Sequence, residues 1–174
     1  AAVALVAILA ASGVALWQAE RARQAAHDTT QVNNFLMDVL KQSDPFDAGA
    51  EITLSEAVDR AAAMVPQRFD GRPDLSARVH HALGYSMASR YKVDLAQREL
   101  GLALDQSTAA FGAGAIETLE VREGLAYLQS SQGKNAEAEA EWKAVIAALE
   151  SGELTGEPLY LVSLNNLGNH YLAL

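Results

Sequence analysis

The sequence predicts an all-α protein, and three observations support that prediction. Apolar side chains recur every three or four residues through most of the 174-residue chain, and no segment shows the alternation of a strand. Proline and glycine are few, four and twelve respectively, while alanine, leucine and glutamate are abundant, as in helical proteins. Segments of similar length also return along the chain, which indicates stacked helix pairs.

The first element is an uncharged apolar run over residues 1–17, closed by Trp17 and followed by Glu20, Arg21 and Arg23. As a helix it would be about 25 Å long, close to the roughly 30 Å of a hydrocarbon core. We expect a single-pass transmembrane helix over 1–17, through which the chain meets the membrane; the alternative is the core of a signal peptide. Because the run is apolar from its first residue, we also expect the chain to be part of a longer protein.

Next come a juxtamembrane helical connector over 18–43 and then a loop and capping helix over 44–72. The connector carries an amphipathic stripe in its second half. Thr53 and Glu56 form the pattern of a capping box, which predicts a helix over about 53–70. We expect this helix to shield the first of the units that follow.

Residues 73–174 show an internal repeat. Pro73 begins the first helix of the region, and apolar periodicity predicts further helices over about 93–111, 115–131, 134–150 and 158–174. Positions 42 residues apart share their character: Leu83, Leu125 and Leu167, then the small Ala96 and Ala138, then the bulky Leu100 and Trp142. A small residue lets two antiparallel helices approach closely, so we predict a right-handed α-solenoid with two full units and a truncated third. The unpaired last helix is expected to make the isolated segment self-associate.

Two stretches carry a resemblance to a known repeat: Ser163-Leu-Asn-Asn-Leu-Gly-Asn-His-Tyr171 and Gln132-Gly-Lys-Asn-Ala-Glu-Ala-Glu-Ala-Glu-Trp142. They resemble the first and second helices of the tetratricopeptide repeat, in the 42-residue variety found in kinesin light chains and many bacterial proteins. The resemblance covers about 74–174. The chain departs from the pattern at Tyr91, where the repeat prefers glycine, and at Gln129, where it prefers an aromatic residue.

Upstream, four phrases resemble the membrane-proximal part of bacterial transmembrane serine/threonine protein kinases. They are Val32-Asn-Asn-Phe-Leu-Met-Asp-Val-Leu40, Ser43-Asp-Pro45, Ile52-Thr-Leu-Ser-Glu-Ala-Val-Asp-Arg-Ala61 and Arg72-Pro-Asp-Leu-Ser-Ala-Arg78. The resemblance implies a cytoplasmic kinase domain before the membrane helix and repeats on the extracytoplasmic, periplasmic side. Transmembrane winged-helix transcriptional regulators have nearly the same tail and remain the alternative, as does a membrane-tethered scaffold with no signalling output.

The residues give no sign of catalysis within the chain. A Gly-rich loop, a catalytic His-Arg-Asp and an Asp-Phe-Gly metal site are all absent from the sequence, and there is no cysteine. His80 and His81 are adjacent and point in different directions on a helix, so we interpret them as surface or groove residues rather than metal ligands. We expect no cofactor and no metal. The net charge of −9 and pI near 4.8 argue against nucleic-acid binding.

The resemblance implies a binding groove for a protein or peptide ligand. In the repeat family, positions two before and two after the conserved leucine face a concave groove, and neighbouring turns extend it. Carried over, these positions are His81 and Tyr85, Glu123 and Tyr127, Asn165 and Asn169, extended by Arg78, Ser89, Glu120 and Ser131. Tyrosine rings and amide groups at such spacing would suit an extended or helical peptide.

Overall fold

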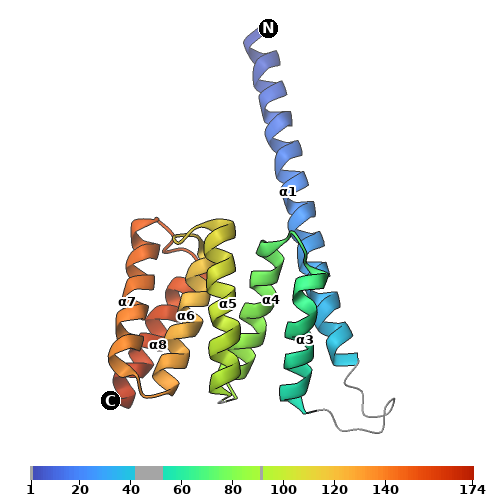
Figure 1. The fold of residues 1–174 in the computed structure, drawn as a ribbon. Helices are drawn as coiled ribbons and strands as arrows, with labels where there is room; N and C mark the ends of the chain where they lie inside the picture. Colours follow the sequence, from blue (N-terminus) through green and yellow to red (C-terminus); the bar gives the residue numbers. More distant parts are fainter. Residues whose placement is uncertain (1, 42–52, 91) are drawn as a thin grey trace. The chain divides into compact units, whose positions relative to one another are not determined.

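The computed structural model describes residues 2–41, 53–90 and 92–174, which form seven α-helices and no strand. The all-α class predicted from the sequence is therefore confirmed for this part of the chain. The chain divides into two compact units, Ala1–Gly49 and Ala50–Leu174. Figure 1 labels the helices of both units, which are described separately below.

The first unit is one helix, α1, over Ala2–Lys41. It runs without interruption through the expected transmembrane and connector segments. Among the described residues, no helix combines the length and apolar character that crossing a membrane requires. The span expected over 1–17 falls mostly on residues 1–11, whose side chains lie outside the described residues, and the loop expected before Thr53 lies outside them as well.

The second unit begins with α3, over Leu54–Arg68, and with a capping box. The Thr53 backbone N–H donates to Glu56 Oε2 at 2.8 Å, and the Glu56 backbone N–H donates to Thr53 Oγ1 at 3.3 Å. The predicted capping box is thus confirmed. The apolar stripe of the helix is buried at Ala61 and Val65, so one face of α3 belongs to the core.

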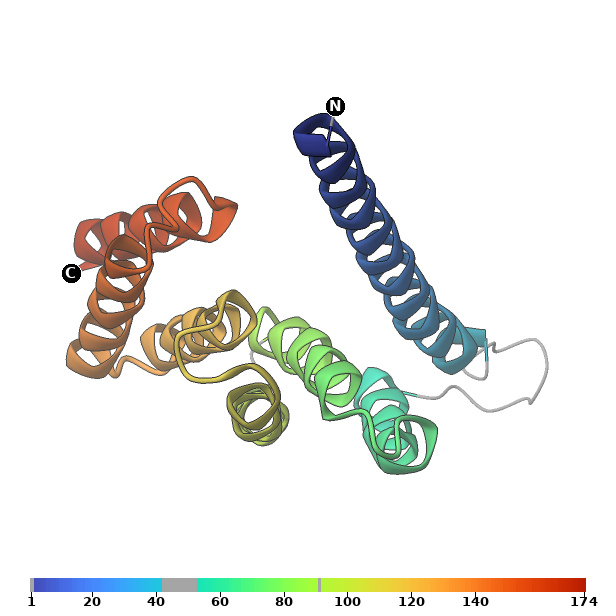
Figure 2. The same ribbon diagram turned by 90° about the horizontal axis from the view of Figure 1, so that it is seen from above.

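Five further helices follow, with bounds within one or two residues of those expected. They are α4 (Pro73–Ala88), α5 (Val93–Phe111), α6 (Ile116–Ser131), α7 (Asn135–Ser151) and α8 (Pro158–Ala173). Successive helices run antiparallel and pack on their neighbours, and the view in Figure 2 shows α3 to α8 following one another in chain order. In addition, α4 contacts α6, and α6 contacts α8.

The 42-residue period is visible in the packing of the helix pairs. Ala96 and Ala138 are completely buried, and so, 42 residues apart, are Leu100 and Trp142. A β-carbon on Gly84 would lie 2.7 Å from Leu100 Cγ, which shows how closely α4 and α5 approach. The small and bulky positions of the repeat therefore pack as their sizes predict.

A polar pair joins the first helix to the second in both complete units. His80 Nδ1 lies 2.7 Å from Glu99 Oε2, and Arg122 Nε donates to Glu141 Oε1 at the positions 42 residues further on. His80 is only 3% exposed, so its interpretation as a surface or groove residue was wrong. The ring faces α5 because a carboxylate waits there to bond it, a partner 19 residues away that periodicity does not reveal.

Candidate functional site

Three aromatic side chains meet where α4 lies against α6. We call His81, Tyr85 and Tyr127 the aromatic patch. The ring centroids of His81 and Tyr85 are 6.3 Å apart in edge-on geometry, and those of Tyr85 and Tyr127 are 5.9 Å apart. Tyr85 is 43% exposed, while His81 and Tyr127 are half-buried. The patch thus presents aromatic ring surface, with polar handles, across two helices.

The repeat and one glycine bring the patch together. Tyr85 and Tyr127 occupy equivalent positions, 42 residues apart, on helices that contact each other. Between them lies Gly124, where an added β-carbon would be 3.7 Å from both His81 Nε2 and Tyr85 Cδ2. Because position 124 carries no side chain, the rings of α4 lie directly against the backbone of α6.

A cavity of about 240 Å³ lies beside the patch, between α4, α5 and α6. We call it the α4–α6 cavity. His81 lines it and so belongs to both features, and two further predicted site residues, Arg78 and Glu120, line it as well. Glu117 and Phe111 also contribute walls. The structure therefore gathers three of the predicted site residues around one small opening.

The charges of the cavity are unevenly balanced. Arg78 Nη2 lies 3.5 Å from Glu117 Oε1, so these two side chains pair with each other. Burial raises the pKa of Glu120, and repulsion by Glu117 and Glu157 adds to that effect, against the attraction of Arg78. Burial lowers the pKa of His81, which is therefore neutral at pH 7. The cavity keeps a net negative charge near neutral pH.

Glu123 lies inside the protein rather than on an open face. It is 4% exposed, and its Oε1 accepts hydrogen bonds from Trp142 Nε1 at 3.4 Å and from Asn166 Nδ2 at 2.5 Å. Burial raises the pKa of Glu123, against the effect of these two bonds. Its carboxyl group ties α6 to α7 and α8, and it adds to the negative surroundings that, after burial itself, raise the pKa of Tyr85.

The remaining predicted site residues lie at the edges of this region. Asn165 and Asn169 are exposed on α8. Ser89 and Ser131 are exposed at helix ends, and each hydroxyl donates to the backbone carbonyl three residues earlier, at 2.9 and 2.7 Å. None of these four side chains makes a ring or ion-pair contact with the aromatic patch in the described part of the chain.

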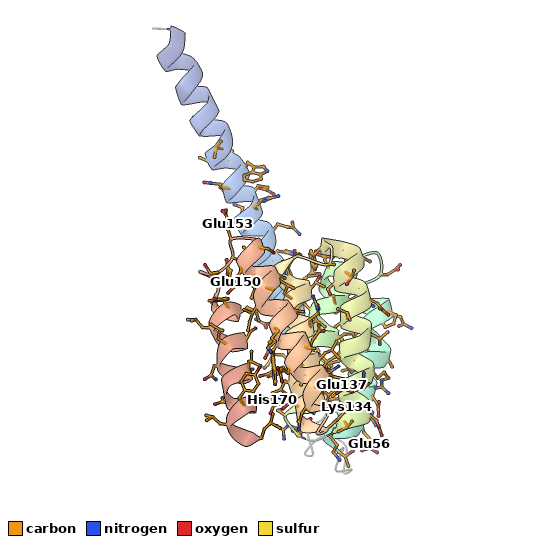
Figure 3. The ribbon with its side chains drawn as sticks, turned by 90° about the vertical axis from the view of Figure 1, so that its left-hand side faces the viewer. Glu56, Lys134, Glu137, Glu150, Glu153 and His170 are labelled. Carbon is orange, nitrogen blue, oxygen red and sulfur yellow. The ribbon has the colours of Figure 1, made fainter. Side chains whose placement is uncertain are left out.

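Residues of α5, α6 and α8 that the sequence did not single out complete the region. Phe111 and Glu117 line the cavity, and Asn166 binds Glu123. On the same side of α8, the His170 ring is buried 5.3 Å from the Trp142 ring and its Nδ1 lies 2.9 Å from Ser130 Oγ (Figure 3). The one available signal was the repeat itself, because Asn166 stands 42 residues after Gly124, the glycine under the patch.

No group of three or more histidine, aspartate or glutamate side chains within the described ranges is arranged to hold a metal ion. Comparison with family models, with curated proteins and with solved structures finds no match for this chain. Function is therefore inferred from the aromatic patch and the α4–α6 cavity.

Proposed function

We propose that residues 73–174 bind a protein or peptide partner on the face that α4, α6 and α8 share, as a non-catalytic interaction region. The observation that carries this proposal is the aromatic patch. Its rings touch across two helices, one of them is 43% exposed, and the two tyrosines recur at the repeat distance. Clustered, rigid, half-exposed tyrosine rings are typical anchors of protein interfaces.

The finer architecture belongs to the same proposal. We assign α4 to α8 to a right-handed α-solenoid of tetratricopeptide type, with α3 as its cap. The contacts of α4 with α6 and of α6 with α8 support this, because stacked first helices form one continuous face in such arrays. The close approach at Gly84 and the repeated polar pairs between first and second helices support it as well.

The wider protein is proposed to be a membrane-anchored bacterial signalling protein, with the repeats on the extracytoplasmic side. On α1, Leu16 and Trp17 are exposed, and the Arg21 guanidinium lies 4.1 Å from the Trp17 ring centroid. An aromatic ring beside a cationic side chain at the end of an apolar run is typical of a membrane interface. The phrases between residues 32 and 78 favour a serine/threonine kinase as the parent, with a winged-helix regulator or a plain scaffold as the alternatives.

Peptide selection tests the binding role. The full chain is used to select from a random 12-residue peptide library on phage, and the affinity of the selected peptide is measured by fluorescence anisotropy. Tyr85→Ala and Tyr127→Ala should each weaken binding by about tenfold or more, because both remove a central ring. Tyr171→Ala is the matched control, since Tyr171 is similarly exposed, at 46%, and lies outside the patch. Equal affinity for all variants would contradict the proposed face.

The DNA upstream of the Ala1 codon tests the parent. A reading frame with a Gly-rich loop, His-Arg-Asp and Asp-Phe-Gly motifs supports the kinase. A basic winged-helix sequence supports the regulator instead, and a start codon with neither leaves a tethered repeat scaffold.

A further inference from the structure

The volume of the α4–α6 cavity limits what it can hold. About 240 Å³ is below the roughly 300–1,000 Å³ of pockets that enclose a drug-sized ligand. The cavity therefore suits one side chain of a larger partner. It also shares His81 with the aromatic patch, so a peptide lying over the patch would pass the opening.

The charge of the cavity selects the kind of side chain. Arg78 is already paired with Glu117, whereas Glu120 makes no hydrogen bond or ion pair with any described residue. The carboxylates of Glu117 and Glu157 act on Glu120 with the same sign, and the adjacent imidazole is neutral at pH 7. An incoming cation would relieve this repulsion and supply the ionic partner that Glu120 lacks.

The walls of the cavity suit the stem of a long cationic side chain. Phe111, Ile116 and Val121 provide apolar surface from α5 and α6. Lysine and arginine bury their methylene stems against such surface while the charged end reaches a polar partner. A short or anionic side chain would use neither the apolar wall nor the free carboxylate.

We propose that the α4–α6 cavity receives a lysine or arginine side chain of the bound peptide, with Glu120 as its ionic partner. This inference rests on the proposed function, since it assumes that a peptide lies along the α4–α6 face. It adds the class of partner: a segment that carries a basic residue next to the part that covers the aromatic patch. The acidic body of the protein, with a net charge of −9, would also attract such a segment from solution.

Nuclear magnetic resonance with blocked amino acids tests the cavity directly. The ¹⁵N-labelled full chain is titrated with N-acetyl-arginine methylamide, with its neutral isostere N-acetyl-citrulline methylamide and with N-acetyl-glutamate methylamide. The arginine probe should shift the backbone amides of Ala77, Phe111 and Glu120 in a saturable way. Citrulline should bind about threefold more weakly or worse, because an ion pair of this exposure contributes modestly.

Two variants of the same charge change complete the test. Glu120→Gln should weaken binding of the arginine probe by about threefold or more. Glu137→Gln, on an exposed carboxylate near the start of α7 (Figure 3), should leave it unchanged. Equal binding of arginine and citrulline, no effect of Glu120→Gln, or preferential binding of the glutamate probe would each overturn the proposal; the last result would make Arg78 the recognising group.

The outcome can be separated from that of the peptide selection. A selected peptide whose affinity depends on Tyr127, but not on Glu120 or on a basic residue of its own, would overturn the cavity proposal and leave the proposed binding face in place. Failure of the tyrosine variants to affect binding overturns the face itself.

Discussion

Gly84 and Leu100 are in such close contact that a β-carbon on Gly84 would lie 2.7 Å from Leu100 Cγ and 2.9 Å from the Leu100 backbone nitrogen. Gly84→Ala should therefore push α4 away from α5 and lower the free energy of unfolding by about 1–3 kcal/mol. Gly168 occupies the position 84 residues later, on α8, and a β-carbon there would meet nothing within 4 Å.

The matched change Gly168→Ala should raise the free energy of unfolding by roughly 0.5–1 kcal/mol, since alanine is the better helix former. Urea denaturation followed by circular dichroism measures both variants. Destabilisation of similar size at both positions would contradict the close approach as its cause.

Glu99 is completely buried and accepts hydrogen bonds from Arg98 Nε at 2.8 Å and from His80. Glu99→Ala should cost roughly 3 kcal/mol of unfolding free energy, because it leaves a buried imidazole without its carboxylate partner. Asp105→Ala is the control on the same helix, at an exposed position, and should change stability by no more than about 0.5 kcal/mol. Thermal and urea denaturation report the difference.

The buried carboxyl group of Glu123 should make stability fall as pH rises. Its pKa in the folded protein is raised above the model value of 4.5, so the folded state holds a proton that the unfolded state has lost. The resulting stabilisation is complete below about pH 4.5 and disappears as the pH rises through the folded pKa.

Glu123→Gln isolates this effect, because glutamine keeps the oxygen that accepts from Asn166 and never ionises. The difference in unfolding free energy, variant minus wild type, should be constant below about pH 4.5 and increase above it. Stability curves at closely spaced pH values give this difference. A flat difference across the whole range would contradict a raised pKa.

The capping box at the start of α3 should stabilise the unit measurably. Thr53→Ala removes the hydroxyl that accepts the Glu56 backbone N–H and should cost about 1 kcal/mol. Thr108→Ala, at an exposed position of α5, tests the loss of a threonine without a cap and should be nearly neutral. Loss of equal size in both variants would show that threonine itself, and not the cap, matters.

Helices and their ends could be predicted from the sequence because their signals are local. The Thr53 and Glu56 pair, proline at the start of α4, and the glycine with positive φ (91°) that ends α5 each act within one turn. The repeat added which positions are buried at the interfaces of pairs, since volume at positions such as Ala96 and Trp142 is fixed by the neighbouring helix.

The candidate site was only partly accessible to the same reasoning. Tyr85 and Tyr127 were identified because they share a repeat position, and the structure brings their rings together. The buried state of Glu123 was not foreseen, because its partners lie on α7 and α8 and replace solvent with specific donors. Phe111 was missed for a related reason, since a cavity between three helices leaves no periodic mark on any one of them.

The order of the helices in the second unit also determines how quickly it forms. Each substantial contact joins helices that are neighbours or next-but-one neighbours in the chain, from α3 to α8. Only short stretches of chain must close before each contact is made, and helical proteins with such local contacts fold in roughly microseconds to milliseconds. A chain emerging from a ribosome or translocation channel could thus assemble each helix pair as soon as its second helix appears.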